Sequence, residues 1–101
     1  MGPQVSELEG KLAEYVGMKH CISCASGTDA LVLSLMGWGI GKGDAVFVPD
    51  FTYIASASSA MLCGATIVLV DVEEKTFNID PVALEKAITK TVENGKLNPK
   101  V

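Results

Sequence analysis

The spacing of apolar residues predicts four helices along the chain. After Pro3, apolar residues recur every three or four positions as far as Gly17, which predicts an amphipathic helix ended by that glycine. A second pattern of this kind begins at Asp80 and Pro81, the expected N-cap and first helical residue. The two remaining predicted helices are apolar on nearly every side and are therefore expected to be buried: 27–36 and 51–63.

Three short runs of apolar residues predict strands: 20–25, 45–48 and 66–70. The apolar residues in them are continuous rather than alternating, which is typical of parallel strands covered on both faces. Because helices and strands alternate, the expected fold class is α/β, with three layers and a mostly parallel sheet between helices. Ligands bind to such sheets beyond the carboxyl ends of the strands.

The composition is that of one globular domain. The chain has 101 residues, of which 49% are hydrophobic and 20% charged, and a chain of this length buries roughly 60–70% of its unfolded surface. Its net charge is −4 and its basic residues are scattered singly, so we expect no nucleic-acid partner. The polar tail over about 93–101 is expected to fray.

One stretch, 51–70, has the length of a membrane span and no charged residue. Gly64 divides it into a helix-like half and a strand-like half, so a buried helix followed by a buried strand explains it better. The residues after Met1 run directly into an amphipathic helix, and Pro3 and Glu7 do not suit a myristoylation site. We therefore expect neither a signal peptide nor a membrane association.

The cysteines do not form a convincing metal or redox site. Cys21 and Cys24 have C-x-x-C spacing, but residues three apart on a strand point to opposite faces. Zinc would have too few partners, since His20 is the only histidine. Cys21, Cys24 and Cys63 are therefore expected to be buried free thiols, which fits a cytoplasmic protein.

The segment Ser26-Gly27-Thr28-Asp29 carries the strongest chemical signal. It joins a predicted strand to a predicted helix, an arrangement that directs unpaired amides and the positive helix end at one point, where a phosphate binds well. The alternative is a helix N-cap with no ligand. Tyr53 follows the next predicted strand and belongs to the same sheet edge, although a core position is the alternative for an aromatic residue. Together, the two places would suit a flat, phosphorylated cofactor.

Other nucleotide or nucleophile motifs are not satisfied. The glycines of 37–43 do not match G-x-G-x-x-G, and they follow a helix and precede a strand, which is the reverse of the dinucleotide-binding order. The sequence has no P-loop, and Cys24 and Thr28 stand where a G-x-S-x-G nucleophile elbow around Ser26 would need glycines.

Several linked motifs resemble the DegT/DnrJ/EryC1/StrS family of pyridoxal-phosphate-dependent sugar aminotransferases of fold type I. The resemblance covers nearly the whole chain, and its motifs are Met1-Gly2-Pro3-Gln4-Val5 followed by Leu8-Glu9, Ser26-Gly27-Thr28-Asp29-Ala30-Leu31, Gly39-Ile40-Gly41-Lys42-Gly43-Asp44, Val48-Pro49-Asp50-Phe51-Thr52-Tyr53-Ile54-Ala55-Ser56-Ala57, Gly64-Ala65-Thr66, Val70-Asp71-Val72 and Phe77-Asn78-Ile79-Asp80-Pro81.

The resemblance implies that residues 1–101 form part of the large, cofactor-binding domain. By resemblance, Gly27, Thr28 and Asp29 grip the phosphate of pyridoxal 5′-phosphate, Ser26 leads into the turn, and Tyr53 stacks on the pyridine ring. Family members are several times longer than this chain, which resembles an internal piece. None of its eight lysines lies in the family's Schiff-base motif, so the chain contains no expected catalytic residue and should be inactive alone.

The implied parent enzyme is a cytoplasmic homodimer that moves an amino group from an amino acid, glutamate being the expected donor, to a nucleotide-linked keto-sugar. One alternative is a sugar dehydratase of the same family, in which His replaces the Schiff-base Lys. Another is a non-catalytic α/β module that binds a phosphorylated ligand. The open edges of a shortened parallel sheet further predict self-association of the chain.

Overall fold

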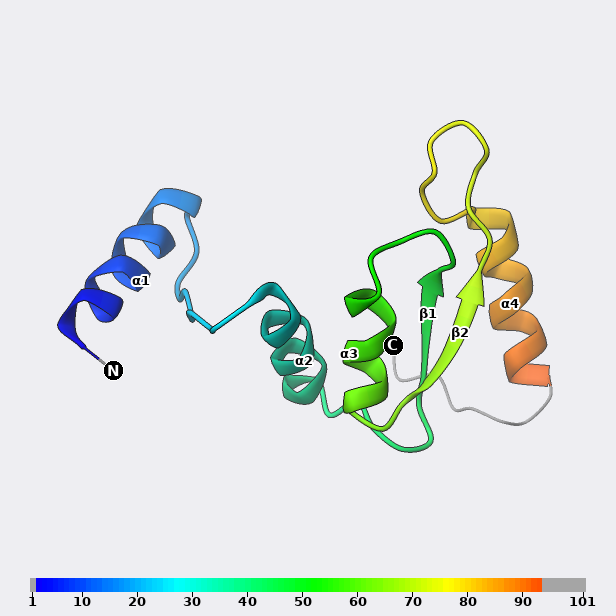
Figure 1. Cartoon of the computed structure of the whole chain (residues 1–101), viewed down its shortest axis with the longest axis horizontal. Coiled ribbons are helices and arrows are strands. Elements are labelled where there is room, and N and C mark those ends of the chain that lie inside the picture. The colour runs from blue at the N-terminus through cyan, green and yellow to red at the C-terminus, as the bar shows by residue number, and fades with distance from the viewer. Residues whose placement is uncertain (1, 94–101) are drawn as a thin grey trace.

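A computed structural model describes residues 2–93 (Figure 1). Its helices and strands alternate in the chain order α1 (Pro3–Val16), α2 (Gly27–Gly37), β1 (Ala45–Pro49), α3 (Ala55–Leu62), β2 (Thr66–Val70) and α4 (Pro81–Glu93). The predicted frayed tail over about 93–101 lies outside the described residues, apart from Glu93 at the end of α4.

The strands found within residues 2–93 form a parallel pair. Ala45 lies opposite Thr66 and Pro49 opposite Val70, and α3 makes the crossover between the strands. The helices α3 and α4 lie on opposite sides of this pair (Figure 1), and both contact β2. This arrangement confirms the α/β class with a parallel sheet between helices. The prediction of 66–70 as a strand is confirmed residue for residue.

The helix ends follow the sequence signals. Gly17 has φ 69°, a left-handed conformation that glycine adopts without strain, and its amide caps the carbonyl end of α1. Gly64, with φ 84°, follows α3 in the same way. At the start of α4, the Asp80 carboxylate accepts a hydrogen bond from the amide of Val82 at 2.8 Å, which confirms Asp80 as an N-cap.

The predicted strand 20–25 is wrong. This segment is irregular between α1 and α2, and the side chain of Ile22 is 82% exposed. A strand needs a neighbouring strand to accept and donate its backbone hydrogen bonds. Neither strand of residues 2–93 pairs with the segment 20–25. The sheet therefore has one strand fewer than predicted.

The expected burial of the two apolar helices is largely wrong. None of the residues of α2 is buried, and α3 begins at Ala55 rather than at residue 51, with only Ala55, Ser59 and Ala60 buried. The helix α2 packs chiefly against α3, so the rest of its surface has no cover among the described residues. The core is small and consists mainly of α3 against the strands, including Val48 and Val70.

No helix of the described range 2–93 has both the length and the apolar character needed to cross a membrane. The uncharged stretch 51–70 instead forms a loop, α3 and β2, so the predicted order of a helix followed by a strand is confirmed. The predicted burial of the strand is wrong for most of β2, in which only Val70 is buried.

Candidate functional site

Ser26 caps the start of α2. Its backbone is extended, with φ −158° and ψ 166°, and its Oγ accepts a hydrogen bond from the amide of Asp29 at 3.1 Å. Its carbonyl accepts the first helical bond, from the amide of Ala30, also at 3.1 Å. Ser26 is therefore the N-cap of α2, and the cap fixes the direction in which the first amides of α2 point.

The amides of Gly27 and Thr28 are open. Neither donates a hydrogen bond to any acceptor in the described chain, and a Cβ placed at Gly27 would meet nothing within 4 Å. Gly27 is exposed and Thr28 half-buried. Two unpaired N–H groups at the positive end of a helix, with free space in front of the glycine, suit an anion such as a phosphate.

Asp29 differs from its two neighbours, because its amide is already occupied by the Ser26 hydroxyl. Its exposed carboxylate lies in the first turn of α2, where a negative charge is favoured by the helix dipole. The amide of Asp29 thus becomes available to a ligand only if the Ser26 cap opens. Of the residues predicted to bind phosphate, Gly27 and Thr28 have amides that could bind it without any change in the cap.

Tyr53 lies in the loop between β1 and α3, and its side chain is 78% exposed. It borders a largely apolar hollow of about 380 Å³, whose lining residues come from both strands, this loop and α3: Pro49, Asp50, Thr52, Tyr53, Ile54, Ala57, Ile67 and Leu69. Within residues 2–93 Tyr53 therefore does not lie in the core, and its ring is exposed beside this hollow.

Two interactions hold this loop at the carboxyl end of the sheet. The amide of Asp50 donates to the carbonyl of Val70 at 2.9 Å, which continues the pairing of the strands into the loop. The ring of Phe51 packs on that of Phe77, with centroids 5.4 Å apart, and so joins the loop to the segment before α4. Tyr53 therefore follows two anchored residues of this loop, Asp50 and Phe51.

The two candidate places share one end of the molecule. The helices α2 and α3 pack together, and both begin at the end where β1 and β2 finish (Figure 1). No hydrogen bond or ring contact of residues 2–93 joins Ser26–Asp29 to Tyr53, and the hollow beside Tyr53 has none of residues 26–29 in its lining. The structure brings the two segments to one end of the sheet without bringing them into contact.

An interaction that the sequence did not predict lies beside this site. The Oε1 atom of Glu9 on α1 accepts hydrogen bonds from both the hydroxyl and the amide of Ser23, at 2.6 and 2.7 Å. The hydroxyl bond and then the amide bond lower the pKa of Glu9 from its ordinary value of 4.5. Fourteen residues separate the partners, so no helical or strand periodicity indicates the pair.

The cysteines and His20 do not form a site. All three cysteines are free, as predicted, but none is buried: Cys21 and Cys63 are half-buried and Cys24 is exposed. Burial was wrongly predicted for Cys21 and Cys24 because it depended on the strand 20–25. Cys63 is only half-buried because it lies directly after α3, as the C-cap residue of that helix. His20 is exposed, and the described range contains no cluster of His, Cys, Asp or Glu suited to a metal ion.

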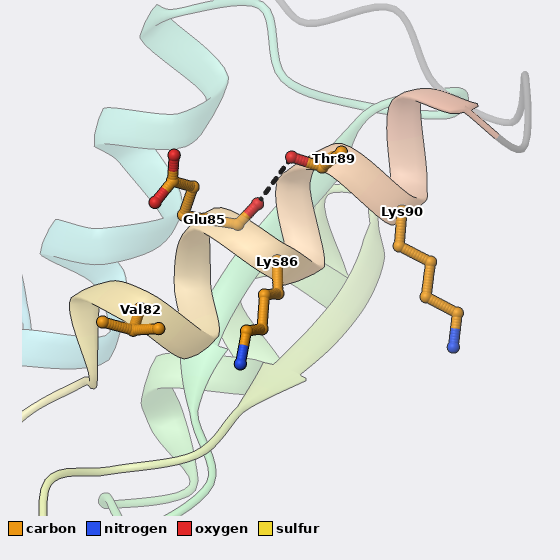
Figure 2. Close-up of a pocket in the computed structure, with 5 residues that line it drawn as sticks. All are labelled: Val82, Glu85, Lys86, Thr89 and Lys90. Atoms are coloured by element: carbon orange, nitrogen blue, oxygen red, sulfur yellow. Dashed lines mark hydrogen bonds between the residues drawn. The ribbon is translucent and has the colours of Figure 1, made fainter.

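A second hollow, of about 310 Å³, lies along α4 (Figure 2). Among residues 2–93, its lining comes from that helix: Val82, Glu85, Lys86, Thr89 and Lys90. The Thr89 hydroxyl donates a hydrogen bond to the carbonyl of Glu85, at 3.0 Å. Because the walls that the described residues provide come from one helix surface, polar groups of several elements do not converge there among residues 2–93. This hollow is a weaker candidate than the end of the sheet.

The comparisons with known proteins point to one family. Residues 1–94 match the DegT/DnrJ/EryC1/StrS aminotransferase family. The chain is 54% identical over 89 residues to the UDP-2-acetamido-2-deoxy-3-oxo-D-glucuronate aminotransferase of Pseudomonas aeruginosa, an alignment that covers 88% of this chain and 25% of that protein. The chain thus spans about a quarter of the length of the curated relatives that it matches.

Solved structures agree with this result. A DegT DnrJ EryC1 StrS aminotransferase from Brucella abortus superimposes with a TM-score of 0.89 and 51% identity, over 99% of this chain and 27% of that one. The PLP-form of the putative sugar aminotransferase Spr1654 from Streptococcus pneumoniae gives a TM-score of 0.82 with 41% identity, over 86% of this chain and 22% of that one. On the match over residues 1–94, the chain belongs to the DegT/DnrJ/EryC1/StrS aminotransferase family.

Proposed function

We propose that residues 1–101 form part of the cofactor-binding large domain of a pyridoxal-phosphate-dependent aminotransferase. The parent enzyme would transfer an amino group from an amino acid, with glutamate as the expected donor, to a nucleotide-linked keto-sugar. The observation that carries this proposal is the pair of open amides at Gly27 and Thr28, at the same end of the sheet as the exposed ring of Tyr53. The relatives named as sugar-nucleotide aminotransferases support the choice of substrate class.

The residues present fit a phosphorylated, flat cofactor. The amides of Gly27 and Thr28 would hold the phosphate, and the Thr28 hydroxyl, which makes no hydrogen bond within the described range, would add a donor. Ser26 would act through its cap, by keeping the first turn of α2 in place. The aromatic face of Tyr53 would bound the ring of the cofactor, beside the largely apolar hollow.

When bound, pyridoxal phosphate supplies the electron sink and the amino-group carrier that the protein lacks. The part of this chain in that chemistry is to bind and orient, since none of its lysines lies in the family's Schiff-base motif. We therefore expect the 101-residue chain alone to bind cofactor without catalysing amino transfer.

We also propose that the protein associates with a second copy of itself and works in the cytoplasm. The outer edges of both β1 and β2 lack a partner strand within residues 2–93, and open edges favour association. Large apolar side chains such as Trp38, 76% exposed, and Met61, 65% exposed, are available for an interface. The free state of all three cysteines agrees with a reducing compartment.

The test of the proposed function is a titration with pyridoxamine 5′-phosphate, which has no aldehyde and therefore does not react with the eight lysines of the chain. We expect saturable binding, followed by the change in cofactor absorbance and fluorescence. Thr28→Ala should weaken binding by about fivefold, the loss of one hydrogen bond. Tyr53→Ala should weaken it by about two- to tenfold through the lost aromatic contact, and Tyr53→Phe should restore most of that loss.

Tyr15→Ala is the matched control, because Tyr15 is 88% exposed and lies on α1, away from the proposed site. Binding that is equally weakened by Tyr15→Ala, or unchanged by both Thr28→Ala and Tyr53→Ala, would contradict the proposed site.

A further inference from the structure

The segment that leads into α2 is attached to α1 at one point. Figure 1 shows α1 standing apart from the other helices and from the strands. The amides of Gly17 and Met18 cap the end of α1. The further hydrogen bonds between α1 and the segment 18–26 are the two that Glu9 accepts from Ser23. Both partners are half-buried, and both bonds end on one carboxylate oxygen, so they fix the hydroxyl and the backbone of Ser23 together.

Ser23 stands three residues before the Ser26 cap, and the residues between them are irregular. The thiol of Cys24 also approaches the carbonyl of Ser26 at 3.3 Å, which further limits the path of this short connection. With Ser23 held by Glu9, the position of Ser26 is restricted from the N-terminal side, while its hydroxyl is bonded to Asp29 on the helix side. Charge-assisted hydrogen bonds of 2.6–2.7 Å are among the stronger restraints that a half-exposed segment can have.

We propose that Glu9 is a positioning residue for the anion site at the start of α2. Its carboxylate acts through Ser23 to hold the connection in the conformation that presents the amides of Gly27 and Thr28. The part played by the ligand rests on the proposed function above. The ordering of the turn by Glu9 can be measured without any ligand.

The experiment compares Glu9→Ala with Glu7→Ala in the full chain. Glu7 is the matched control, because it lies two residues earlier on the same helix and makes only an exposed ion pair with Lys11, at 2.7 Å. Hydrogen exchange is followed by NMR at the amides of Ser23 and Asp29, which report the Glu9 contact and the Ser26 cap, and at Ala13, which reports α1 itself. The affinity for pyridoxamine 5′-phosphate is measured on the same samples.

For Glu9→Ala we expect exchange at Ser23 and Asp29 to accelerate by about fivefold or more, with a loss of pyridoxamine phosphate affinity of similar size. Exchange at Ala13 should change little. Glu9→Gln keeps an acceptor oxygen at the same place and should recover part of both effects, and it replaces Glu9→Ala if that variant does not fold. Glu7→Ala should match the wild type throughout.

The proposal is overturned if Glu9→Ala leaves exchange at Asp29 unchanged, or accelerates Asp29 and Ala13 equally, which would indicate a general structural role. Equal effects of Glu7→Ala and Glu9→Ala would overturn it as well. If the wild type does not bind pyridoxamine phosphate, the proposed function fails, and exchange at Asp29 alone decides the role of Glu9.

Discussion

The cap at the start of α2 gives a sharp prediction for Ser26→Ala. The substitution removes the Oγ atom that accepts the Asp29 amide at 3.1 Å and leaves that amide to solvent. Losing a Ser N-cap costs about 0.5–2 kcal/mol. Ser26 and Asp29 are both exposed, so water replaces part of the lost bond. We therefore expect the free energy of unfolding to fall by about 1 kcal/mol.

Ser34→Ala is the matched control, since it makes the same chemical change in the same helix. The Ser34 hydroxyl donates to the carbonyl of Ala30 at 2.8 Å from an exposed position inside α2. Such a bond competes with the helix rather than capping it, and alanine has the higher helix propensity, by about 0.5 kcal/mol. Ser34→Ala should therefore leave the free energy of unfolding unchanged or raise it by up to that amount.

Both variants are measured by urea unfolding, followed by far-ultraviolet circular dichroism. A loss of about 1 kcal/mol corresponds to a fall in Tm of about 4–8 °C for a domain of this size. The cap assignment would be refuted if the two variants changed the free energy of unfolding equally. Ser26→Ala also frees the Asp29 amide, which can then donate to a bound phosphate. The free energy of phosphate binding should therefore fall by less than the free energy of unfolding does.

Three further predictions follow from the structure. Ala60→Leu should lower the free energy of unfolding by about 1–3 kcal/mol through overpacking, because Ala60 is 0% exposed, whereas Met61→Leu at an exposed position should have little effect in the same urea assay. Gly64→Ala should lower the free energy of unfolding by about 1–2 kcal/mol, because φ at Gly64 is 84°. Gly10→Ala within α1 should raise it by about 0.5–1 kcal/mol. A change of the same sign in both variants would contradict the backbone conformation of Gly64. An NMR titration should give Glu9 a pKa below 4.5. Folding lowers the pKa of Glu9, so the stability that the Ser23 contact contributes should be complete above pH 4.5. That contribution should be lost as the pH falls through the pKa of Glu9 in the folded protein. A contribution to stability that grows on acidification would exclude the contact.

Local signals in the sequence were sufficient for the elements they govern. The β-branched run after Gly64 defines β2, Gly17 ends α1 in a left-handed conformation, and Asp80 with Pro81 starts α4. Each of these depends on backbone preferences within a few residues, and so it can be predicted without knowledge of the surrounding structure.

Properties that depend on distant neighbours could not be predicted in this way. Residues 20–25 have the composition of a strand but no strand beside them among the described residues, and α2 has an apolar surface that α3 covers on one side only. The start of α3 was predicted too early because apolar residues continue through the loop that contains Phe51 and Tyr53. The contact between Glu9 and Ser23 left no periodic signal at all.

The candidate site likewise has a part that depends on local sequence and a part that depends on packing. The Ser26 cap and the open amides that follow it are local, and the sequence predicts them directly. The position of Tyr53 relative to that turn depends on how α2 packs against α3, which the sequence does not determine by itself. The structure places both at one end of the sheet, and their joint action on one ligand stays a prediction.

The most direct test of the account compares two ligands by NMR on the full chain. Inorganic phosphate should shift the amide resonances of Gly27 and Thr28 and leave the ring resonances of Tyr53 unchanged. Pyridoxamine 5′-phosphate should shift the amides and the Tyr53 ring together, with one common Kd. Amides and ring that respond to pyridoxamine phosphate with different Kd values, or a Tyr53 ring that never responds, would contradict a shared cofactor site.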